Sequence, residues 1–178
     1  MGLFQRVFGE KEKTQLKNLD KEFVYEKQTV YSPMKGEVIP LSEVDDPVFA
    51  EGMMGVGVGI EPETDQLFAP VDGVVAAVFP TGHALGIQTD DGMELLIHIG
   101  INTVELEGEG FQTFVKQGDR VKAGELLVEF KRAWIKEKGY KVTTMVLVSN
   151  GGLLGNMTDP VLGLVKPLDI LYSFQEKS

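Results

Sequence analysis

Two histidines are the residues of this chain best suited to chemistry, and they are the only two in 178 residues. His83 and His98 each lie in an apolar, β-prone run, and a turn signal, Asp90-Asp91-Gly92, separates them. We therefore predict a β-hairpin with one histidine on each strand. A neutral imidazole can be a nucleophile, a proton carrier or a metal ligand when a hydrogen bond on its second nitrogen fixes the tautomer. Thr81 and the carbonyl of Gly100 are the nearest candidates for those hydrogen bonds.

The pairing register decides whether the two rings can meet, because side chains alternate faces along a strand. A two-residue loop at Asp90-Asp91 would place His83 directly opposite His98. A loop at Asp91-Gly92 would place them diagonally, roughly 7 Å apart at the backbone and within reach of two rings. A three-residue loop would put them on opposite faces unless a bulge restored the parity. A single strand histidine is more often a satisfied structural residue, but this pairing favours a shared reactive site on one face.

Composition and charge exclude several classes of protein. The net charge is -10 and the pI is near 4.7, so the surface repels phosphate backbones and disfavours nucleic-acid binding. The absence of cysteine excludes disulfides, thiolate metal sites and a catalytic thiol. No apolar run approaches the roughly 20 residues of a spanning helix, and nothing resembles a signal peptide, which favours the cytoplasm.

The length suits one domain, which we place at residues 29–178, after a flexible leader at residues 1–28. Four apolar residues of the leader share one helical face: Leu3, Phe4, Val7 and Phe8. Such a face is typical of a weak membrane-surface helix. A helix of one or two turns is marginal by itself, so a disordered leader is the favoured interpretation.

From Val30 onward, short runs of Val, Ile and Leu broken by Gly or Pro predict an all-β fold with little helix. An internal repeat accompanies them, because Ser32–Val38 resembles Ala69–Val75 with Pro and Gly both displaced by 37 residues. Two copies suit an antiparallel β-sandwich or barrel-like domain with approximate internal symmetry. One short helix is expected within Lys131–Gly139. Two closing strands are expected, at residues 142–148 and 168–174.

The stretch from about Thr29 to Asn150 strongly resembles the glucose-type enzyme IIA component of the bacterial phosphoenolpyruvate-dependent sugar phosphotransferase system. Four motifs carry the resemblance: Phe68-Ala69-Pro70-Val71-Asp72-Gly73, Pro80-Thr81-Gly82-His83-Ala84, the run Glu94–Leu106 around His98, and Gly108-Glu109-Gly110-Phe111. The resemblance covers about two thirds of the chain. It implies an antiparallel β-sandwich or barrel-like domain, consistent with the strand pattern.

The resemblance also implies a phosphotransferase that takes a phosphoryl group from the phosphocarrier HPr and passes it to a cysteine on the IIB domain of a sugar permease. His98 would be the phosphorylated nucleophile and His83 would stabilise the phosphoryl group in transit, while Thr81 and Gly100 would orient the rings. No cofactor is required, although the resemblance allows zinc to bind His83 and His98 when a partner supplies a carboxylate. The sugar cannot be read from this chain, because specificity lies in the permease.

Both partners would dock on a ring of residues around the histidines, the docking collar: Asp46, Val48, Phe49, Met53, Phe79 and Leu96. Soft Met and Phe side chains suit adaptable docking surfaces, although a packed connection explains the segment Asp46–Met54 equally well. Asn102 stands where the family often has an acidic residue, which weakens any pairing with an arginine at that position.

Two alternatives come from other classes of protein. Val115–Leu127 also resembles a biotinyl or lipoyl carrier domain, but Met34-Lys35-Gly36 lacks the usual tripeptide around the modified lysine. A zinc peptidase of the lysostaphin-like type shares the glycine-rich β pattern. It requires a His-x-His pair and three protein ligands, whereas His98 is followed by Ile99-Gly100.

Overall fold

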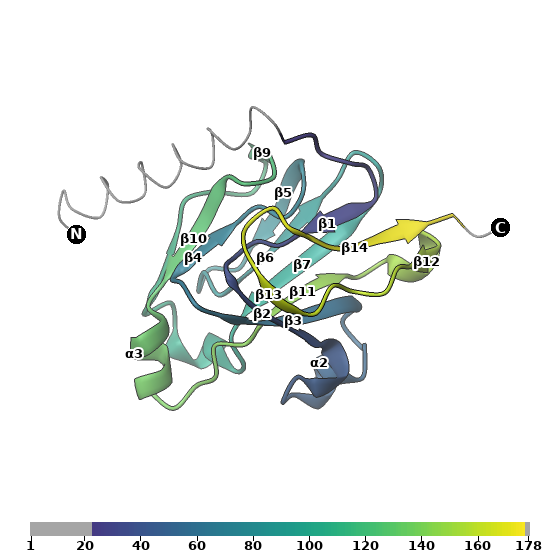
Figure 1. The fold of residues 1–178 in the computed structure, drawn as a ribbon. Coiled ribbons are helices and arrows are strands. Elements are labelled where there is room, and N and C mark those ends of the chain that lie inside the picture. Colours follow the sequence, from purple (N-terminus) through teal and green to yellow (C-terminus); the bar gives the residue numbers. More distant parts are fainter. Residues whose placement is uncertain (1–22, 177–178) are drawn as a thin grey trace.

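The computed structural model describes residues 23–176, and nearly all of its regular structure is β (Figure 1). The strands are β1 (Thr29–Tyr31), β2 (Gly36–Pro40), β3 (Val56–Pro62), β4 (Gln66–Phe68), β5 (Gly73–Val78), β6 (Ala84–Gln88), β7 (Glu94–Ile99), β8 (Phe111–Thr113), β9 (Arg120–Val121), β10 (Leu126–Phe130), β11 (Thr144–Val148), β12 (Asn156–Met157), β13 (Gly163–Val165) and β14 (Ile170–Gln175). The α-helices are α2 (Pro47–Ala50) and α3 (Arg132–Glu137). Short 3-10 segments occupy Leu41–Glu43, Thr103–Leu106 and Gly151–Leu153. The predicted all-β class is confirmed, and the predicted short helix is α3, with Ile135 buried in the core.

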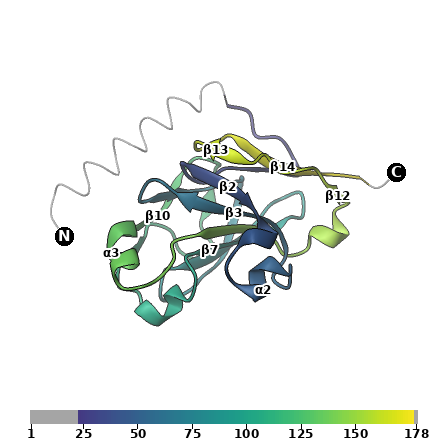
Figure 2. The same ribbon diagram turned by 60° about the horizontal axis from the view of Figure 1, so that its bottom comes forward.

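The strands form three antiparallel sheets (Figures 1 and 2). The large sheet has eight strands in the order β13-β2-β3-β11-β7-β6-β5-β9, and the two smaller sheets are β1-β14-β12 and β4-β10-β8. One hydrophobic core joins them, with residues from the large sheet such as Ile97 and Val146 and from the smaller sheets such as Leu67 and Leu171. This sandwich of packed sheets agrees with the predicted architecture.

Strands β7 and β11 lie at the middle of the large sheet, and their alternating side chains separate two cores. On β11, Val146 and Val148 face the main core, while Met145 and Leu147 belong to a second, smaller cluster on the opposite face. Phe49 of α2 packs in that second cluster, so α2 covers the outer face of the sheet (Figure 2). His98 is paired with Met145 and therefore points to the face that α2 covers.

The internal repeat is confirmed by hydrogen bonds that the two copies exchange. The amide of Tyr31 donates to the carbonyl of Pro70 (3.0 Å), and the amide of Phe68, 37 positions further on, donates to the carbonyl of Pro33 (2.7 Å). The symmetry also extends to the later strands. Gly36 of β2 pairs with Val165 of β13, as Gly73 of β5 pairs with Val121 of β9. The fold is thus built from two interlocked copies of one unit.

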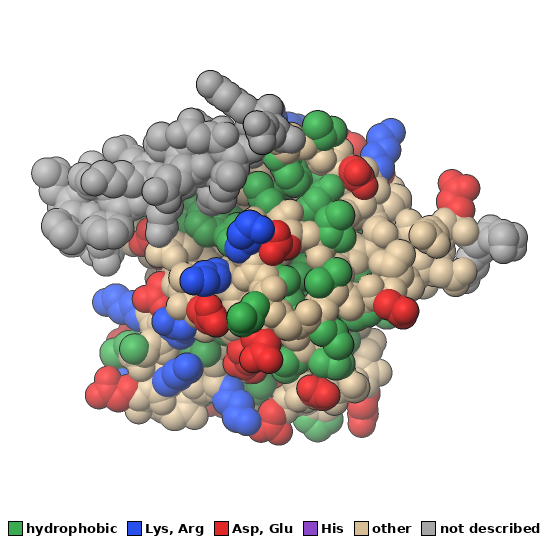
Figure 3. Space-filling view, in the orientation of Figure 1, with side chains coloured by type: hydrophobic (Ala, Val, Ile, Leu, Met, Phe, Trp, Pro, Cys, Tyr) green, Lys and Arg blue, Asp and Glu red, His purple; other side chains and the backbone are tan. Residues whose placement is uncertain are grey.

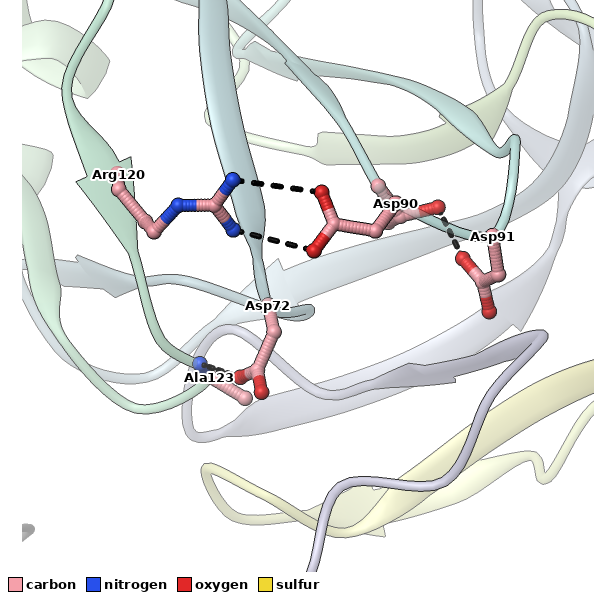
Figure 4. Close-up of polar contacts among 6 residues, drawn as sticks. Asp72, Asp90, Asp91, Arg120 and Ala123 are labelled. Atoms are coloured by element: carbon pink, nitrogen blue, oxygen red, sulfur yellow. Dashed lines mark hydrogen bonds and ion pairs between the residues drawn. The ribbon is translucent and has the colours of Figure 1, made fainter.

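The segment before β1 contacts the rest of the domain at the turn between β6 and β7. The backbone and side-chain amides of Gln28 donate to the carboxylate and the carbonyl of Asp91, each over 2.6 Å. Asp91 also accepts a hydrogen bond from the hydroxyl of Thr89, whereas its neighbour Asp90 pairs with Arg120 on the surface (Figure 4). The last residues of the predicted leader therefore contact the domain. The apolar face of Leu3, Phe4, Val7 and Phe8 lies outside the described residues.

The surface over β13 and β14 mixes apolar, acidic and basic side chains, and no histidine is visible on that face (Figure 3). Leu164 and Ile170 are its exposed apolar residues on these strands, at 75% and 47% exposure. No helix among residues 23–176 is long and apolar enough to cross a membrane.

Candidate functional site

The predicted hairpin is formed by β6 and β7, but only His98 lies within one of its strands, because His83 directly precedes β6. The predicted two-residue loop is also wrong. Ala84 pairs with His98 and Gln88 with Glu94, and the amide of Thr89 donates to the carbonyl of Met93 (2.9 Å), which leaves a three-residue loop. In strict alternation this register would put the histidines on opposite faces. They share a face because His83 precedes the first residue of β6 and lies in a bend after Gly82. The carbonyl of His83 accepts a hydrogen bond from the amide of Ile99 (2.7 Å).

The two imidazole rings are in contact. Their centroids lie 4.8 Å apart, with an angle of 78° between the ring planes. His83 is almost fully buried, at 4% exposure, whereas His98 is partly open to solvent. A macromolecular partner can therefore reach His98 more readily than His83.

Each ring has its Nδ1 atom occupied by a group two residues away. Nδ1 of His98 lies 2.8 Å from the carbonyl oxygen of Gly100, and Nδ1 of His83 lies 2.5 Å from the hydroxyl of Thr81. A carbonyl oxygen only accepts hydrogen bonds, so Nδ1 of His98 must carry the proton and its Nε2 must hold a free lone pair. The hydroxyl of Thr81 can donate to Nδ1 of His83, which leaves Nε2 of His83 as an N–H donor.

Both rings are held in the neutral form at neutral pH. Burial lowers the pKa of His83 to about 4, and the neighbouring His98 acts in the same direction. Burial also lowers the pKa of His98, although the hydrogen bond to Gly100 and the carboxylate of Asp46 act in the opposite direction. A neutral imidazole with a free lone pair is a competent nucleophile.

Aromatic side chains flank the two rings. Phe49 lies against His98, with ring centroids 5.0 Å apart, and Phe79 lies against His83 at 5.7 Å. Leu96 lies two residues before His98 on β7 and packs on the same cluster as Phe49. Asp46 caps α2 by accepting a hydrogen bond from the amide of Val48 (2.9 Å).

The remaining residues of the predicted docking collar are open to solvent. Val48 is 43% exposed, Met53 70% and Phe79 46%. Met53 is tied to α2 because its amide donates to the carbonyl of Val48 (3.2 Å). Met54 and Val56 are not among the six predicted collar residues and are also exposed in this region. The sequence alone does not show whether the apolar residues at these positions are exposed or buried.

The two histidine rings are the candidate metal ligands of the site. Among the described residues, no group of three or more His, Cys, Asp or Glu side chains could hold a metal ion. His83 and His98 supply two ligands, whereas catalytic zinc is held by three protein ligands and an open position. Zinc at this site would therefore need further ligands from a partner.

Comparison with known proteins assigns the family. The family model described as the phosphoenolpyruvate-dependent sugar phosphotransferase system, EIIA 1, matches residues 28–152. The glucose-specific EIIA component of Oceanobacillus iheyensis is 50% identical over 122 residues, which cover 68% of this chain and 74% of that protein. The solved structure of the glucose permease IIA from Mycoplasma capricolum superposes with a TM-score of 0.76 at 38% identity, covering 81% of this chain and 93% of that chain.

Other relatives are much longer proteins. The beta-glucoside-specific EIIBCA component of Halalkalibacterium halodurans is 50% identical over 132 residues, which are 74% of this chain but 21% of that protein. This chain thus spans about a fifth of the length of several curated relatives that it matches. These matches select one interpretation over the carrier-domain and zinc-peptidase alternatives. The chain belongs to the EIIA family of the phosphoenolpyruvate-dependent sugar phosphotransferase system.

Proposed function

We propose that this chain is a cytoplasmic phosphocarrier that accepts a phosphoryl group from HPr on His98 and passes it to the IIB domain of a sugar permease. The observation that carries the proposal is the asymmetry of the two touching rings. His98 is the more accessible ring, and the carbonyl of Gly100 leaves its Nε2 with a lone pair. His83 is buried beside it and can present an N–H group toward the same space.

The proposed transfer consists of two displacements at phosphorus. In the first, a bond forms between phosphorus and Nε2 of His98 while the bond to the donor atom of HPr breaks. The proton on Nδ1 stays on the ring because the carbonyl of Gly100 accepts it in a hydrogen bond. In the second, a cysteine thiolate of the IIB domain attacks phosphorus, and the electron pair of the broken bond returns to Nε2.

His83 has a separate role in this proposal. Phosphoryl transfer depends on positioning and on stabilising the charge of the equatorial oxygens. An N–H donor that is already fixed in a partly buried site provides that stabilisation without reorganising. Thr81 holds the ring of His83 in the tautomer that donates from Nε2.

The docking collar is the proposed surface for both partners. Val48, Met53 and Phe79 are exposed, and Phe79 lies against the ring of His83. Asp46 adds a carboxylate suited to basic partner groups. Asn102 supplies no charge, so the electrostatic attraction of a basic partner to this surface would come from Asp46. Zinc bound by His83 and His98 together with a partner carboxylate is compatible with this surface, and no step of the transfer requires it.

Phosphorylation by phosphoenolpyruvate, enzyme I and HPr tests the proposal on wild type, His98→Gln and His83→Gln. We expect one acid-labile phosphate per chain in wild type and none in His98→Gln. His83→Gln should be labelled but should donate to the IIB domain about 10²-fold more slowly, as for loss of one charge-stabilising donor.

Two results would contradict this assignment. Labelling that is lost only in His83→Gln would mean that the roles of the two histidines are reversed. A folded wild-type protein that takes no label from phosphorylated HPr would exclude the phosphocarrier function altogether.

A further inference from the structure

Thr103 is a buried polar residue close to the site, and it has no part in the two displacements proposed above. It is fully buried, and its hydroxyl donates to the carbonyl of Ile99 over 2.5 Å. Ile99 is the last residue of β7 and directly follows His98. The hydroxyl of Thr103 therefore acts on the peptide unit between His98 and the carbonyl that orients its ring.

The backbone after His98 is held by a frame of hydrogen bonds. In the peptide unit of Ile99 and Gly100, the carbonyl is bound by Thr103 and the amide donates to the carbonyl of Thr143 (3.0 Å). In the next unit, the carbonyl of Gly100 faces His98 and the amide of Ile101 donates to the carbonyl of Lys141 (3.0 Å). Thr103 is the only side chain among these partners other than the imidazole itself.

Packing links Thr103 to Gly100 as well. Gly100 has a φ of +79°, in the left-handed region, and a Cβ atom at this position would collide with the side chain of Thr103. The methyl and hydroxyl groups of Thr103 thus fill the space beside the Gly100 Cα atom. The direction of the Gly100 carbonyl depends on the backbone conformation that this contact and the hydrogen bond maintain together.

We propose that Thr103 is a positioning residue that, through the Ile99–Gly100 peptide, aims the Gly100 carbonyl at Nδ1 of His98 and so keeps the lone pair on Nε2. This inference rests on the proposed function, since it concerns the nucleophile of that reaction. Without the hydroxyl, the carbonyl of Ile99 loses its partner and the Gly100 peptide can turn. The proton of His98 is then no longer confined to Nδ1, and the fraction of rings with a nucleophilic Nε2 falls.

Three variants separate positioning from stability. Thr103→Val removes the hydroxyl and keeps the shape, and Thr103→Ser keeps the hydroxyl and removes the methyl group. Thr29→Val is the matched control, because Thr29 is also buried and its hydroxyl donates to a backbone carbonyl, that of Lys27, over 3.1 Å. Thr29 lies on β1, in a different sheet from the histidines.

The first measurement is the ¹⁵N NMR spectrum of the His98 ring, which reports the tautomer. Wild type, Thr103→Ser and Thr29→Val should show the Nδ1–H tautomer, whereas Thr103→Val should show a mixture. The second measurement is the rate of labelling by phosphorylated HPr. The labelling rate of Thr103→Val should fall in proportion to its loss of the Nδ1–H tautomer, about twofold where half of the rings change tautomer, and Thr103→Ser should recover most of the wild-type rate.

A Thr103→Val protein with the wild-type tautomer and labelling rate would overturn the proposal, however much stability it had lost. If Thr103→Val does not fold, Thr103→Cys replaces it, and its weak S–H donor should give an intermediate tautomer mixture. A wild-type His98 that shows a mixture of tautomers would also overturn it. Failure of wild type to accept any label would reject the proposed function, while the NMR result would still decide whether Thr103 orients His98.

Discussion

At the scale of single residues, the site combines two neutral rings whose Nδ1 atoms are both occupied. Thr81 and Gly100 were identified from their spacing, two residues from each histidine, and the structure places them at the ring nitrogens. The hydrogen bond of Thr103 could not be anticipated in this way. It depends on a turn after β7 whose geometry comes from contacts with residues 141–143, some forty positions away in the chain.

The burial of His83 makes stability depend on pH. Its pKa is about 4 in the folded protein and about 6.5 in an unfolded chain, so acidification protonates the unfolded state first. Stability should be unaffected by this group above pH 6.5 and should fall by about 3 kcal/mol as the pH drops toward 4. Urea unfolding of wild type and His83→Gln at pH 7.5, 5.5 and 4.5 measures the difference. Equal losses of stability in both proteins would show that His83 is not the group responsible.

At the scale of secondary-structure elements, the hairpin was predictable and its register was not. The turn signal and the apolar runs located both strands. The loop length, however, depends on a hydrogen bond between Thr89 and Met93 that the pattern of apolar and polar residues does not reveal. The bend at His83, just before β6, turns its side chain to the same face as His98. Strand alternation therefore predicted correctly that the two rings meet, but the register on which that prediction rested is not the one in the structure.

The turn of the hairpin provides a matched pair of substitutions. Asp91→Ala removes the acceptor for the amide of Gln28 and the hydroxyl of Thr89, so we expect a loss of about 1–3 kcal/mol in unfolding free energy. Asp90→Ala removes only an exposed ion pair with Arg120 and should cost about 0.5 kcal/mol or less. Chemical denaturation of the two variants tests this difference, and similar losses would refute the role given to Asp91.

Helix α2 is the element that should affect docking without affecting chemistry. Val48→Ser removes an exposed apolar side chain from the docking collar, so transfer from HPr should need a higher concentration of the donor, with the same final labelling. Leu164→Ser is the control, since Leu164 is exposed on β13. Initial rates across a range of HPr concentrations distinguish the two. An equal effect of both substitutions would argue against a docking role for α2.

At the scale of the whole molecule, the repeat was only half visible in the sequence. Pro33 and Gly36 recur as Pro70 and Gly73, whereas the equivalence of β13 with β9 rests on pairing and shares few identical side chains. One sign of it is Leu168, which adopts a positive φ of 74° in the turn that corresponds to Gly124 at 94°. Backbone geometry has been retained where residue types have diverged.

The symmetry predicts equal effects from two distant substitutions. A Cβ atom at Gly36 would collide with the carbonyl oxygen of Glu61, and one at Gly73 would meet that of Gln88 in the same way. Gly36→Ala and Gly73→Ala should each cost about 1–3 kcal/mol, and the two values should agree within about 1 kcal/mol. Gly152→Ala, with no atom within 4 Å of its Cβ position, is the control. Losses of unfolding free energy that differ widely between Gly36→Ala and Gly73→Ala would show that the two copies do not contribute equally to stability.

The contacts of Gln28 determine where a longer polypeptide can be attached. Gln28 binds the turn of the hairpin through Asp91, and its carbonyl accepts the amide of Phe174 over 2.9 Å, so Gln28 and the end of β14 are fixed side by side. His98 lies at the opposite end of β7 from that turn. A polypeptide attached at either segment would therefore meet the domain at the end away from His98. Attachment at that end is compatible with both arrangements found among the relatives, a separate EIIA component and a segment of a longer EIIBCA component.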